Sequence, residues 1–565
     1  MAEGERTMPP IYSKEWKIPF IQNSGDFRQT RTSPCEKACL LGNSIQKVHT
    51  LLAEGRVDEA LLWLHVRNPF PGVTGRVCPH PCEGKCNRTS YDEPMAIHSL
   101  ERFAADHGRG LRLRPLPESG RRIAVVGAGP AGLAAARFAS LLGHGVDVYE
   151  SSPVMGGAPR QVIPDFRLPK DVVDRECAAA VEGDVQVFTN VTAGRDVMVA
   201  DLLERYDACL MTTGLWKERI LDIPGREHLK TAVNWLRRMT LERESLEGRD
   251  VAILGGGGVA FDCAFTAKRL KARSVHLICL EDDSSMRAPA EEVRQAREEG
   301  ICLHQSLLSR SVEETDGRLR VKAEKVSSFR FDETGRLHAE MADEAAFLLD
   351  ADLVICASGL KLDETALCGM DVERTPRGMV KVDDDFRTSV PGLFAAGDMA
   401  SGPGLVASAI GAGRRAAVAL HRFLCGEQAP LDIFIDEEGN VCTQKAESCV
   451  EPHVVAFEEM MNIDYHEHAP RQVQPVKDAA PGVAFHELED GLSPEQAVKE
   501  ASRCMHCGHC MECGSCVESC PGHILEMTDD GPAVAYPAQC WHCGCCRIAC
   551  PTGSIAYKFP LTMML

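Results

Sequence analysis

Eight cysteines near the C-terminus of this chain fall into two runs of the same spacing. Each run reads C-x2-C-x2-C-x3-C-P, with Pro521 ending the first run and Pro551 the second. Three thiolates on one tight loop can wrap one face of an iron–sulfur cube, whereas structural zinc sites usually pair two C-x2-C units at a distance. The spacing therefore favours two four-iron clusters, and a pair of structural zinc sites is the weaker alternative.

The same spacing indicates which thiols share a cluster. In bacterial two-cluster ferredoxins the fourth cysteine of each run ligates the other cluster. The first expected ligand set is Cys510, Cys513, Cys516 and Cys550, and the second is Cys540, Cys543, Cys546 and Cys520. We therefore expect an α+β ferredoxin-like domain over residues 501–565, with Cys545 outside both sets.

The size and charge of the chain disfavour several functions. Its 565 residues suggest roughly three or four folding units. A net charge of −20 argues against a nucleic-acid partner or an anionic membrane surface, since both attract clustered Lys and Arg. No export signal is recognisable and no stretch approaches about 18 uninterrupted apolar residues, so we expect a cytoplasmic protein without membrane insertion. In that compartment cysteines act more readily as metal ligands or free thiols than as disulfides.

Residues 121–150 carry a strand, a glycine-rich turn, an Ala-rich helix, a second strand and an acid. Such glycines let the backbone approach a pyrophosphate at a helix N-terminus, and Glu150 is placed to bind a ribose hydroxyl. The residues expected to contact this first dinucleotide are Gly127, Gly129, Pro130, Ala131, Gly132 and Glu150.

A second unit of this kind begins in VAILGGGGVAFDCAFTAKRL and ends its second strand near Glu281. Two such folds imply two dinucleotides. The residues expected to contact the second dinucleotide are Gly255, Gly257, Gly258, Val259, Ala260, Glu281 and Gly359.

The first fold usually holds FAD in flavoproteins with two dinucleotides, and a later segment supports that assignment. There Gly397 and Asp398 end a short apolar strand, where the aspartate can bind ribityl or phosphate oxygens of a flavin. A simple helix cap is the alternative role for Asp398.

Three segments carry a more specific resemblance: GGAPRQVIPDFRLPK, GGGGVAFDCAFTAKRL and FAAGDMASGPGLVASAI. They resemble the small subunit of glutamate synthase and its relatives, which include the flavin subunit of electron-bifurcating transhydrogenase and the N-terminal half of dihydropyrimidine dehydrogenase. The resemblance spans about residues 30–425 and implies FAD in the first fold and a nicotinamide nucleotide in the second. It adds to the expected FAD contacts Gly157, Arg160, Ile163 and Ala407.

The chain departs from this family where nucleotide specificity is set. Relatives specific for NADPH carry Arg-Arg after the second strand of the nucleotide fold, whereas this chain has Leu280 and Glu281, followed by Asp282 and Asp283. A carboxylate there repels a 2′-phosphate and accepts a bond from a free 2′-hydroxyl, so we expect NAD(H). An exposed acidic turn without influence on specificity is the alternative. A disulfide-reductase function is disfavoured, because no close cysteine pair occurs in the flavin and nucleotide parts.

The resemblance also implies iron–sulfur sites in residues 33–88. Carried over by motif, Cys39, Cys78 and Cys82 share one four-iron cluster. Glu101 stands where dihydropyrimidine dehydrogenase uses a glutamine side chain as the fourth ligand. A plain surface glutamate on a helix is the alternative for Glu101.

Cys35 and Cys86 belong to a further cluster in the family pattern, but residues 1–34 lack the upstream C-x2-C that completes it. Cys504 and Cys507, in KEASRCMHC, resemble that missing element. We hypothesise that these two residues join Cys35 and Cys86, either within the chain or across a homodimer that exchanges tails. The alternative is a pair of free thiols.

We therefore expect a multidomain α/β protein. The expected units are a helical iron–sulfur domain (1–115), an FAD-binding domain (120–225 and 350–425), an NAD(H)-binding domain (226–349), an extended connector (426–500) and the ferredoxin-like domain (501–565). NADH would give a hydride to the flavin, which would release single electrons to the clusters, so we name no catalytic residue.

The most favoured function is an NAD(H)-linked electron-transfer subunit of a larger oxidoreductase. The family suggests redox protein partners such as a 2-oxoacid oxidoreductase or a dissimilatory sulfite reduction system. The alternatives are a self-contained flavoenzyme that reduces a small organic substrate and a component of an electron-bifurcating complex.

Overall fold

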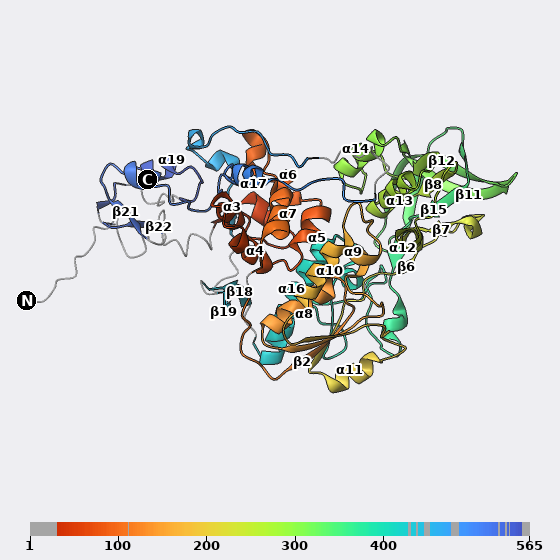
Figure 1. The fold of residues 1–565 in the computed structure, drawn as a ribbon, viewed down its shortest axis with the longest axis horizontal. Helices are drawn as coiled ribbons and strands as arrows, with labels where there is room; N and C mark the ends of the chain where they lie inside the picture. Colours follow the sequence, from red (N-terminus) through yellow and green to blue (C-terminus); the bar gives the residue numbers. More distant parts are fainter. Residues whose placement is uncertain are drawn as a thin grey trace, which may run out of the picture.

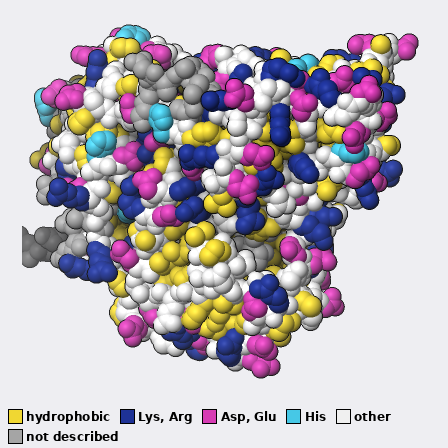
Figure 2. Space-filling view, turned by 45° about the vertical axis from the view of Figure 1, so that its right-hand side comes forward, with side chains coloured by type: hydrophobic (Ala, Val, Ile, Leu, Met, Phe, Trp, Pro, Cys, Tyr) yellow, Lys and Arg dark blue, Asp and Glu magenta, His cyan; other side chains and the backbone are white. Residues whose placement is uncertain are grey.

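The computed structural model describes residues 31–110, 112–427, 431–436, 439–445, 452–475, 485–528, 531–536, 539–541 and 543–555. In Figure 1 the ferredoxin-like part lies at one end, a group of N-terminal helices lies next to it, and the two nucleotide-binding parts lie beyond those helices. Among the described residues no helix is long and apolar enough to cross a membrane. Acidic and basic side chains are interspersed over the face shown in Figure 2.

The N-terminal part is helical, as its heptad-like apolar spacing and proline-initiated turns favour. Its helices are α2 (Pro34–Ala38), α3 (Ile45–Ala53), α4 (Val57–His65), α5 (Pro71–Val77), α6 (Pro81–Gly84) and α7 (Ile97–His107). Leu51, Leu52 and Leu100 are almost completely buried between them. Several cysteines border this core, so the helices hold thiols in apolar surroundings.

The first nucleotide-binding part contains a five-stranded parallel sheet of order β17-β5-β2-β3-β4. The strands are β2 (Arg122–Val126), β3 (Gly145–Tyr149), β4 (Val185–Phe188), β5 (Ala208–Met211) and β17 (Leu393–Ala395). Helices of this part are α8 (Pro130–Leu141), α9 (Gly157–Gln161), α10 (Lys170–Ala180), α11 (Val199–Arg205), α15 (Asp398–Ser401) and α16 (Val406–Cys425). The central strands are apolar without alternation because both faces of the sheet are covered.

The second nucleotide-binding part contains another parallel sheet, of order β10-β9-β8-β15-β7. Its strands are β7 (Lys230–Thr231), β8 (Asp250–Leu254), β9 (Ser274–Ile278), β10 (Cys302–His304) and β15 (Leu353–Cys356), and its helices are α12 (Ala232–Glu242), α13 (Gly258–Arg269) and α14 (Ala290–Glu298). An antiparallel layer adds β11 (Leu307–Thr315), β12 (Arg318–Phe331), β13 (Leu337–Met341) and β14 (Phe347–Ala351).

One expected boundary between these two parts differs from the structure. We placed residues 350–425 with the FAD-binding part, but β15 pairs in parallel with β7 and β8 and so lies in the second sheet. Its apolar residues fill the centre of that sheet, and the chain crosses back to the first part only afterwards. The short strands β6 (Lys217–Glu218) and β16 (Leu360–Lys361) pair where the two crossings run side by side.

The connector contains short elements that pack against the rest of the chain. The strands β18 (Leu431–Ile435) and β19 (Val441–Lys445) form a hairpin, and β20 (His453–Val454) pairs with β1 (Arg31–Thr32). The helix α17 (Pro494–Ala501) crosses the boundary that we expected at residue 501 and contacts α3 and α7. The ferredoxin-like part follows, with α18 (Ser515–Glu518), β21 (Leu525–Thr528), β22 (Gly531–Val534) and α19 (Cys545–Ala549).

Candidate cofactor and cluster sites

The first glycine turn lies between β2 and α8 and has room only for glycine. A Cβ at Gly132 would lie 1.9 Å from the carbonyl oxygen of Gly127, and a Cβ at Gly127 would lie 2.6 Å from that of Thr212. Gly127 also has a φ of +106°, which disfavours a side chain. Gly129 instead faces open space, with no atom closer than 4.0 Å to its Cβ position. This geometry fits a pyrophosphate that approaches the N-terminus of α8.

The acid at the end of β3 lies against the same turn. One carboxylate oxygen of Glu150 accepts a hydrogen bond from the Ala128 N–H at 2.8 Å, and the other accepts from the Ser152 N–H at 2.7 Å. The side chain is buried, so these bonds hold the carboxylate in place. Its remaining lone pairs are available to a ribose hydroxyl.

The other residues expected at the first dinucleotide come from three segments. A Cβ at Gly157 would lie 2.9 Å from the Cα of Gly129, so α9 begins against the glycine turn. Arg160 pairs with Asp174 at 2.6 Å, and the Ile163 carbonyl accepts from the Lys170 ammonium. Pro130 and Ala131 start α8, and Ala407 is buried at the start of α16.

Asp398 is the second residue to consider at this turn. A Cβ at the neighbouring Gly397 would lie 2.9 Å from the Ala131 side chain, which places the start of α15 beside the start of α8. Burial raises the pKa of Asp398 to about 6, although a backbone N–H bond from Gly404 opposes that shift. Asp398 is thus a half-buried carboxyl beside the first glycine turn.

The second glycine turn lies between β8 and α13. Gly255 has a φ of +141°, and a Cβ there would lie 2.5 Å from the carbonyl oxygen of Ala357. Gly257 faces open space, and Gly258, Val259 and Ala260 form the first turn of α13. Gly359, with a φ of +103°, follows β15 and also has open space at its Cβ position.

Glu281 lies directly against this second turn. Its Oε2 is 2.5 Å from the Cβ position of Gly256, and the residue is buried. Glu281 forms an ion pair with Arg287, whose Nε lies 3.6 Å from Glu281 Oε1 and whose side chain is 63% exposed. Asp282 and Asp283 are exposed and are bonded to nearby side chains, so Glu281 is the acid that faces the turn.

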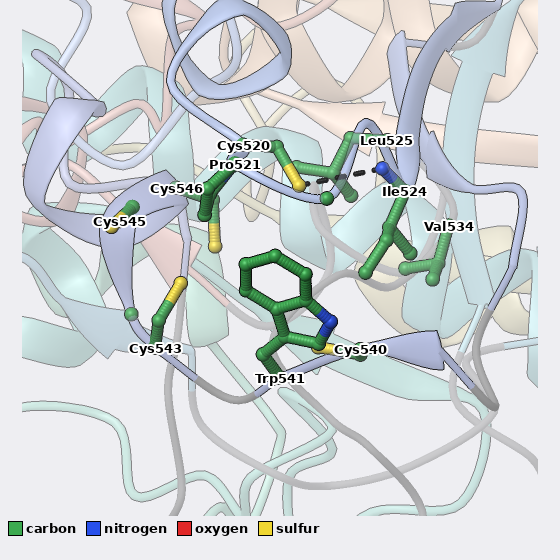
Figure 3. A pocket seen from close by; sticks show the side chains of 12 residues that line it. Cys520, Pro521, Ile524, Leu525, Val534, Cys540, Trp541, Cys543, Cys545 and Cys546 are labelled. Carbon is green, nitrogen blue, oxygen red and sulfur yellow. Dashed lines mark hydrogen bonds between the residues drawn. The ribbon is translucent and has the colours of Figure 1, made fainter.

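The ferredoxin-like part contains two pockets, and each is lined by one of the expected cysteine sets. Cys510, Cys513, Cys516 and Cys550 line one pocket together with Pro551, Thr552 and Ser554. The other pocket is shown in Figure 3 and is lined by Cys520, Cys540, Cys543 and Cys546, and also by Cys545, which we expected outside both sets. The walls of both pockets are otherwise mainly apolar, which suits a four-iron cluster.

Hydrogen-bond donors reach several of these sulfurs, those of Cys510, Cys520 and Cys550 among them. The Ile524 N–H donates to Cys520 Sγ at 3.4 Å, the bond drawn in Figure 3. Ser554 Oγ lies 3.3 Å from Cys550 Sγ. Burial acts to raise the pKa of Cys550, but hydrogen bonds from Ser554 and Thr552 outweigh it and lower the pKa. These donors favour the thiolate that iron requires.

Glu101 lies with the first N-terminal set. Burial raises the pKa of Glu101 to about 7, and burial, with a smaller contribution from the charge of Glu101, raises the pKa values of Cys39, Cys78 and Cys82. Asn68 Nδ2 donates to Glu101 Oε1 at 2.9 Å, and Thr74 Oγ1 donates to the same oxygen. The carboxylate is therefore a buried, oriented group beside three thiols and not a surface residue, and Oε2 is the oxygen free of these two bonds.

The four cysteines expected to form the second N-terminal set lie close to one another within one chain. Burial raises the pKa of Cys504, and Cys507 and Cys86 raise it further. Cys86 and Cys504 act in the same direction on Cys35, below the effect of burial. The four thiols of Cys35, Cys86, Cys504 and Cys507 thus lie together, all in buried surroundings.

Hydrogen bonds fix the returning segment beside the N-terminal helices. Gln46 Nε2 donates to the Cys507 carbonyl at 3.3 Å, and Arg88 donates to the Arg503 carbonyl. The fully buried Glu500 accepts from the Ala96 N–H at 2.8 Å and from Arg503 at 2.7 Å. The tail reaches the N-terminal part of its own chain.

Sequence comparisons add the family. A model described as "Pyridine nucleotide-disulphide oxidoreductase" matches residues 121–413, more than half of the chain. One described as "Dihydroprymidine dehydrogenase domain II, 4Fe-4S cluster" matches residues 27–112, and a "4Fe-4S dicluster domain" matches residues 509–554. The glutamate synthase [NADPH] small chain of Mycobacterium tuberculosis (strain CDC 1551 / Oshkosh) is 34% identical, over 75% of this chain and 94% of that relative. The chain belongs to the glutamate synthase small-chain family of iron–sulfur flavoproteins.

Two other relatives match a larger share of this chain than the glutamate synthase subunit does. The NADP(+)-dependent formate dehydrogenase subunit beta of Moorella thermoacetica is 33% identical over 84% of this chain and 70% of its own length. The NADPH-Fe(3+) oxidoreductase subunit beta of Geobacter sulfurreducens (strain DL-1 / KN400) is 28% identical over 84% and 75%. The expected fold class, the recognised family and the oxidoreductase assignment are confirmed.

Sequence reasoning missed several residues that surround these sites. Asn68 and Thr74 orient Glu101, and Gln46 holds the Cys507 backbone, but none of them belongs to a motif. Trp541 lines the pocket of Figure 3 and is 66% exposed. The sequence did place Trp541 directly after Cys540, and an aromatic residue within a run of cluster ligands is expected to lie beside the cluster.

Proposed function

We propose that this iron–sulfur flavoprotein carries electrons between NAD(H) and a redox protein partner through four four-iron clusters arranged in sequence. Bound FAD would supply the exchange between a two-electron hydride donor and one-electron carriers. The protein contributes the glycine turns that seat the two dinucleotides and the thiols that seat the clusters.

The arrangement of the four cysteine sets carries this proposal. The set with Cys39 and Cys78 borders the core of the first nucleotide-binding part. There the carbonyl oxygen of Leu40 lies 2.8 Å from the Cβ position of Gly411 on α16, so only a glycine lets the two segments approach. This set therefore lies on the flavin side of the helical domain.

The set of Cys35, Cys86, Cys504 and Cys507 leads on to the ferredoxin-like part. Cys35 and Cys39 occur in the same short segment, so the two N-terminal sets are neighbours. On the other side, the Gly508 N–H bonds to the Thr552 carbonyl at 2.7 Å, and Arg31 donates to the Gly553 carbonyl at 2.6 Å. The pocket that contains Cys550 thus lies nearest the helical domain.

The pocket of Figure 3 is then the outer one. Cys543 is exposed and Trp541 projects at the surface beside it. The ferredoxin-like part lies at the end of the molecule away from the nucleotide-binding parts in Figure 1. A redox partner that docks at this end would exchange electrons with the outer cluster.

The proposed nucleotide is NAD(H), although the glutamate synthase and Geobacter relatives named above have NADPH in their names. Glu281, buried against the second glycine turn, supports this choice, because a carboxylate there can accept a hydrogen bond from a 2′-hydroxyl and repels a 2′-phosphate.

The experiment that tests the proposal removes the bridging set alone. In the Cys504→Ser/Cys507→Ser variant we expect the loss of one four-iron cluster, measured as iron and acid-labile sulfide per chain. Flavin reduction by NADH should keep its rate, while electron transfer from the reduced flavin to an acceptor that docks at the ferredoxin end should fall at least tenfold in stopped-flow absorbance.

The matched control is Cys368→Ser, because Cys368 is exposed and belongs to none of the four sets. It should retain the full iron content and both rates. Unchanged iron content in the double variant would contradict the bridging set, and unchanged transfer to the outer acceptor would contradict the proposed path.

A further inference from the structure

A group of metal-binding side chains lies at the C-terminal end of α16, away from the glycine turns and the cysteine sets. His421 and Cys425 are four residues apart on this helix, and His144 precedes β3 beside them. His144 Nε2 lies 3.0 Å from His421 Nδ1, and Cys425 Sγ lies 3.9 Å from the same nitrogen. All three ligand atoms lie within 4.8 Å of one another. Two of the residues are buried and Cys425 is exposed, so the group opens to solvent on one side.

The His144 ring is held by a second hydrogen bond. Ser119 Oγ lies 2.7 Å from His144 Nδ1, on the side of the ring away from His421. A proton on Nδ1 that is shared with this hydroxyl leaves the Nε2 lone pair directed at the group.

A carboxylate faces the same group. Gly426 ends α16 with a φ of +68°, and the Glu427 N–H bonds back to the Arg422 carbonyl at 2.9 Å. The Glu427 carboxylate acts electrostatically on both His421 and Cys425, so it lies near these two residues. Within the part of the chain that the structure describes, Glu427 Oε2 is buried and has no hydrogen-bond partner. A buried carboxylate oxygen without a donor needs a cation.

We propose that His144, His421 and Cys425 bind a zinc ion, and that the nearby Glu427 carboxylate turns toward it as the fourth ligand. Zinc–nitrogen bonds of about 2.0–2.1 Å and a zinc–sulfur bond of about 2.3 Å, at tetrahedral angles, place the ligand atoms roughly 3.3–3.6 Å apart. The observed 3.0 and 3.9 Å differ from these separations by only a few tenths of an ångström.

The charges of this site are also balanced. One thiolate, one carboxylate and two neutral imidazoles neutralise a divalent ion. Arg121 acts electrostatically on both Cys425 and His144, but its guanidinium is paired with Asp207 at 2.7 Å and so does not take the place of the ion. A simple hydrogen bond between the two histidines would explain their short separation but not the unpartnered Glu427 oxygen.

Such an ion would fasten the end of α16 to the sheet. The start of this 20-residue helix lies at the proposed flavin site, and its end would be tied by zinc to His144, the residue before β3. The site is thus structural, with no role in the electron path, and its loss should reduce the thermal stability of the first nucleotide-binding part without changing cluster content.

The test measures zinc in the full, cluster-loaded protein. Wild-type protein dialysed against zinc chloride and then against metal-free buffer should retain one more zinc per chain than Cys425→Ser, by mass spectrometry of the elements. X-ray absorption at the zinc edge should show one sulfur and three nitrogen or oxygen ligands. Cys368→Ser, an exposed thiol elsewhere, should retain zinc like the wild type.

A second variant shows whether the loss of zinc in Cys425→Ser is an indirect effect of the serine. His421→Gln should also lose the zinc, and both variants should keep the iron and flavin content of the wild type. Equal zinc in the wild type and in both variants would overturn the proposal. Zinc surrounded by four sulfurs would also overturn it, because that ion would occupy a vacated cluster set.

Discussion

Glu281 offers a sharp test of nucleotide choice, because one atom change removes its charge and keeps its shape. We consider Glu281→Gln. The wild-type carboxylate is buried against Gly256 and its side chain is only 11% exposed. The neighbouring Arg287 lies 3.6 Å away and is 63% exposed, so it only partly offsets the negative charge.

Two effects add in this substitution. A hydrogen bond from a ribose hydroxyl to a carboxylate contributes about 1.5–3 kcal/mol, and an amide keeps roughly half of it. Removing the carboxylate also ends its repulsion of a 2′-phosphate, which at about 4 Å and an effective dielectric constant near 20 has an upper bound of about 4 kcal/mol per charge pair. With salt screening and the exposed Arg287, we expect a combined change of about 3 kcal/mol in the preference for NADH over NADPH, or roughly 150-fold.

The assay is the dissociation constant of each nucleotide from the concentration dependence of flavin reduction. Most of the change should come from tighter NADPH binding, because the substitution removes the repulsion between the carboxylate and the 2′-phosphate. Asp282→Asn is the control: Asp282 is exposed and bonded to Ser284 and Ser285, so its substitution should leave both constants unchanged. A nucleotide preference that stays the same in Glu281→Gln would refute the assignment of Glu281 to the ribose.

Two further predictions concern binding and stability. Gly132→Ala should abolish FAD content, because its Cβ would lie 1.9 Å from a backbone oxygen. Gly257→Ala meets no atom within 4 Å, so it should keep FAD and lose only NADH binding. The absorbance of the bound flavin and a titration with NADH distinguish the two variants. Glu299→Ala should lower the free energy of unfolding in urea by about 3–5 kcal/mol, because Arg269, which Glu299 pairs with at 3.0 Å, would be left charged in the core. The control Glu242→Ala removes an exposed ion pair and should lower it by about 0–1 kcal/mol.

Motifs with a fixed spacing gave the parts of this molecule that could be predicted. The C-x2-C-x2-C-x3-C runs indicated the two sets that line separate pockets, since iron–sulfur geometry restricts the spacing. The glycine turns could be predicted from the sequence, because the fold leaves no room for a side chain at Gly132 and Gly255 and so requires glycine there. The place of β15 was harder to predict, because an apolar strand fits either sheet and only its pairing partners decide.

The side chains around the sites could not be predicted, because they come from segments that the fold brings together. Gln46 and Cys507 meet across 461 residues, and no local pattern records such a contact. His144 likewise has meaning only beside His421, which lies 277 residues further along the chain.

Cys504 and Cys507 show why a site can be stable although its ligands lie far apart in the sequence. Arg88 contacts the backbone of Arg503 across 415 residues. Loop-closure entropy grows only by about 0.6 kcal/mol for each doubling of length, so moving a ligand pair from a loop of about 10 residues to one of about 400 costs only about 3 kcal/mol. The buried Glu500 and Arg503, with their hydrogen bonds to the N-terminal part, can offset a cost of that size. The same contacts fix the ferredoxin-like part on the helical domain, so a cluster held by all four thiols would both conduct electrons and hold the tail in place.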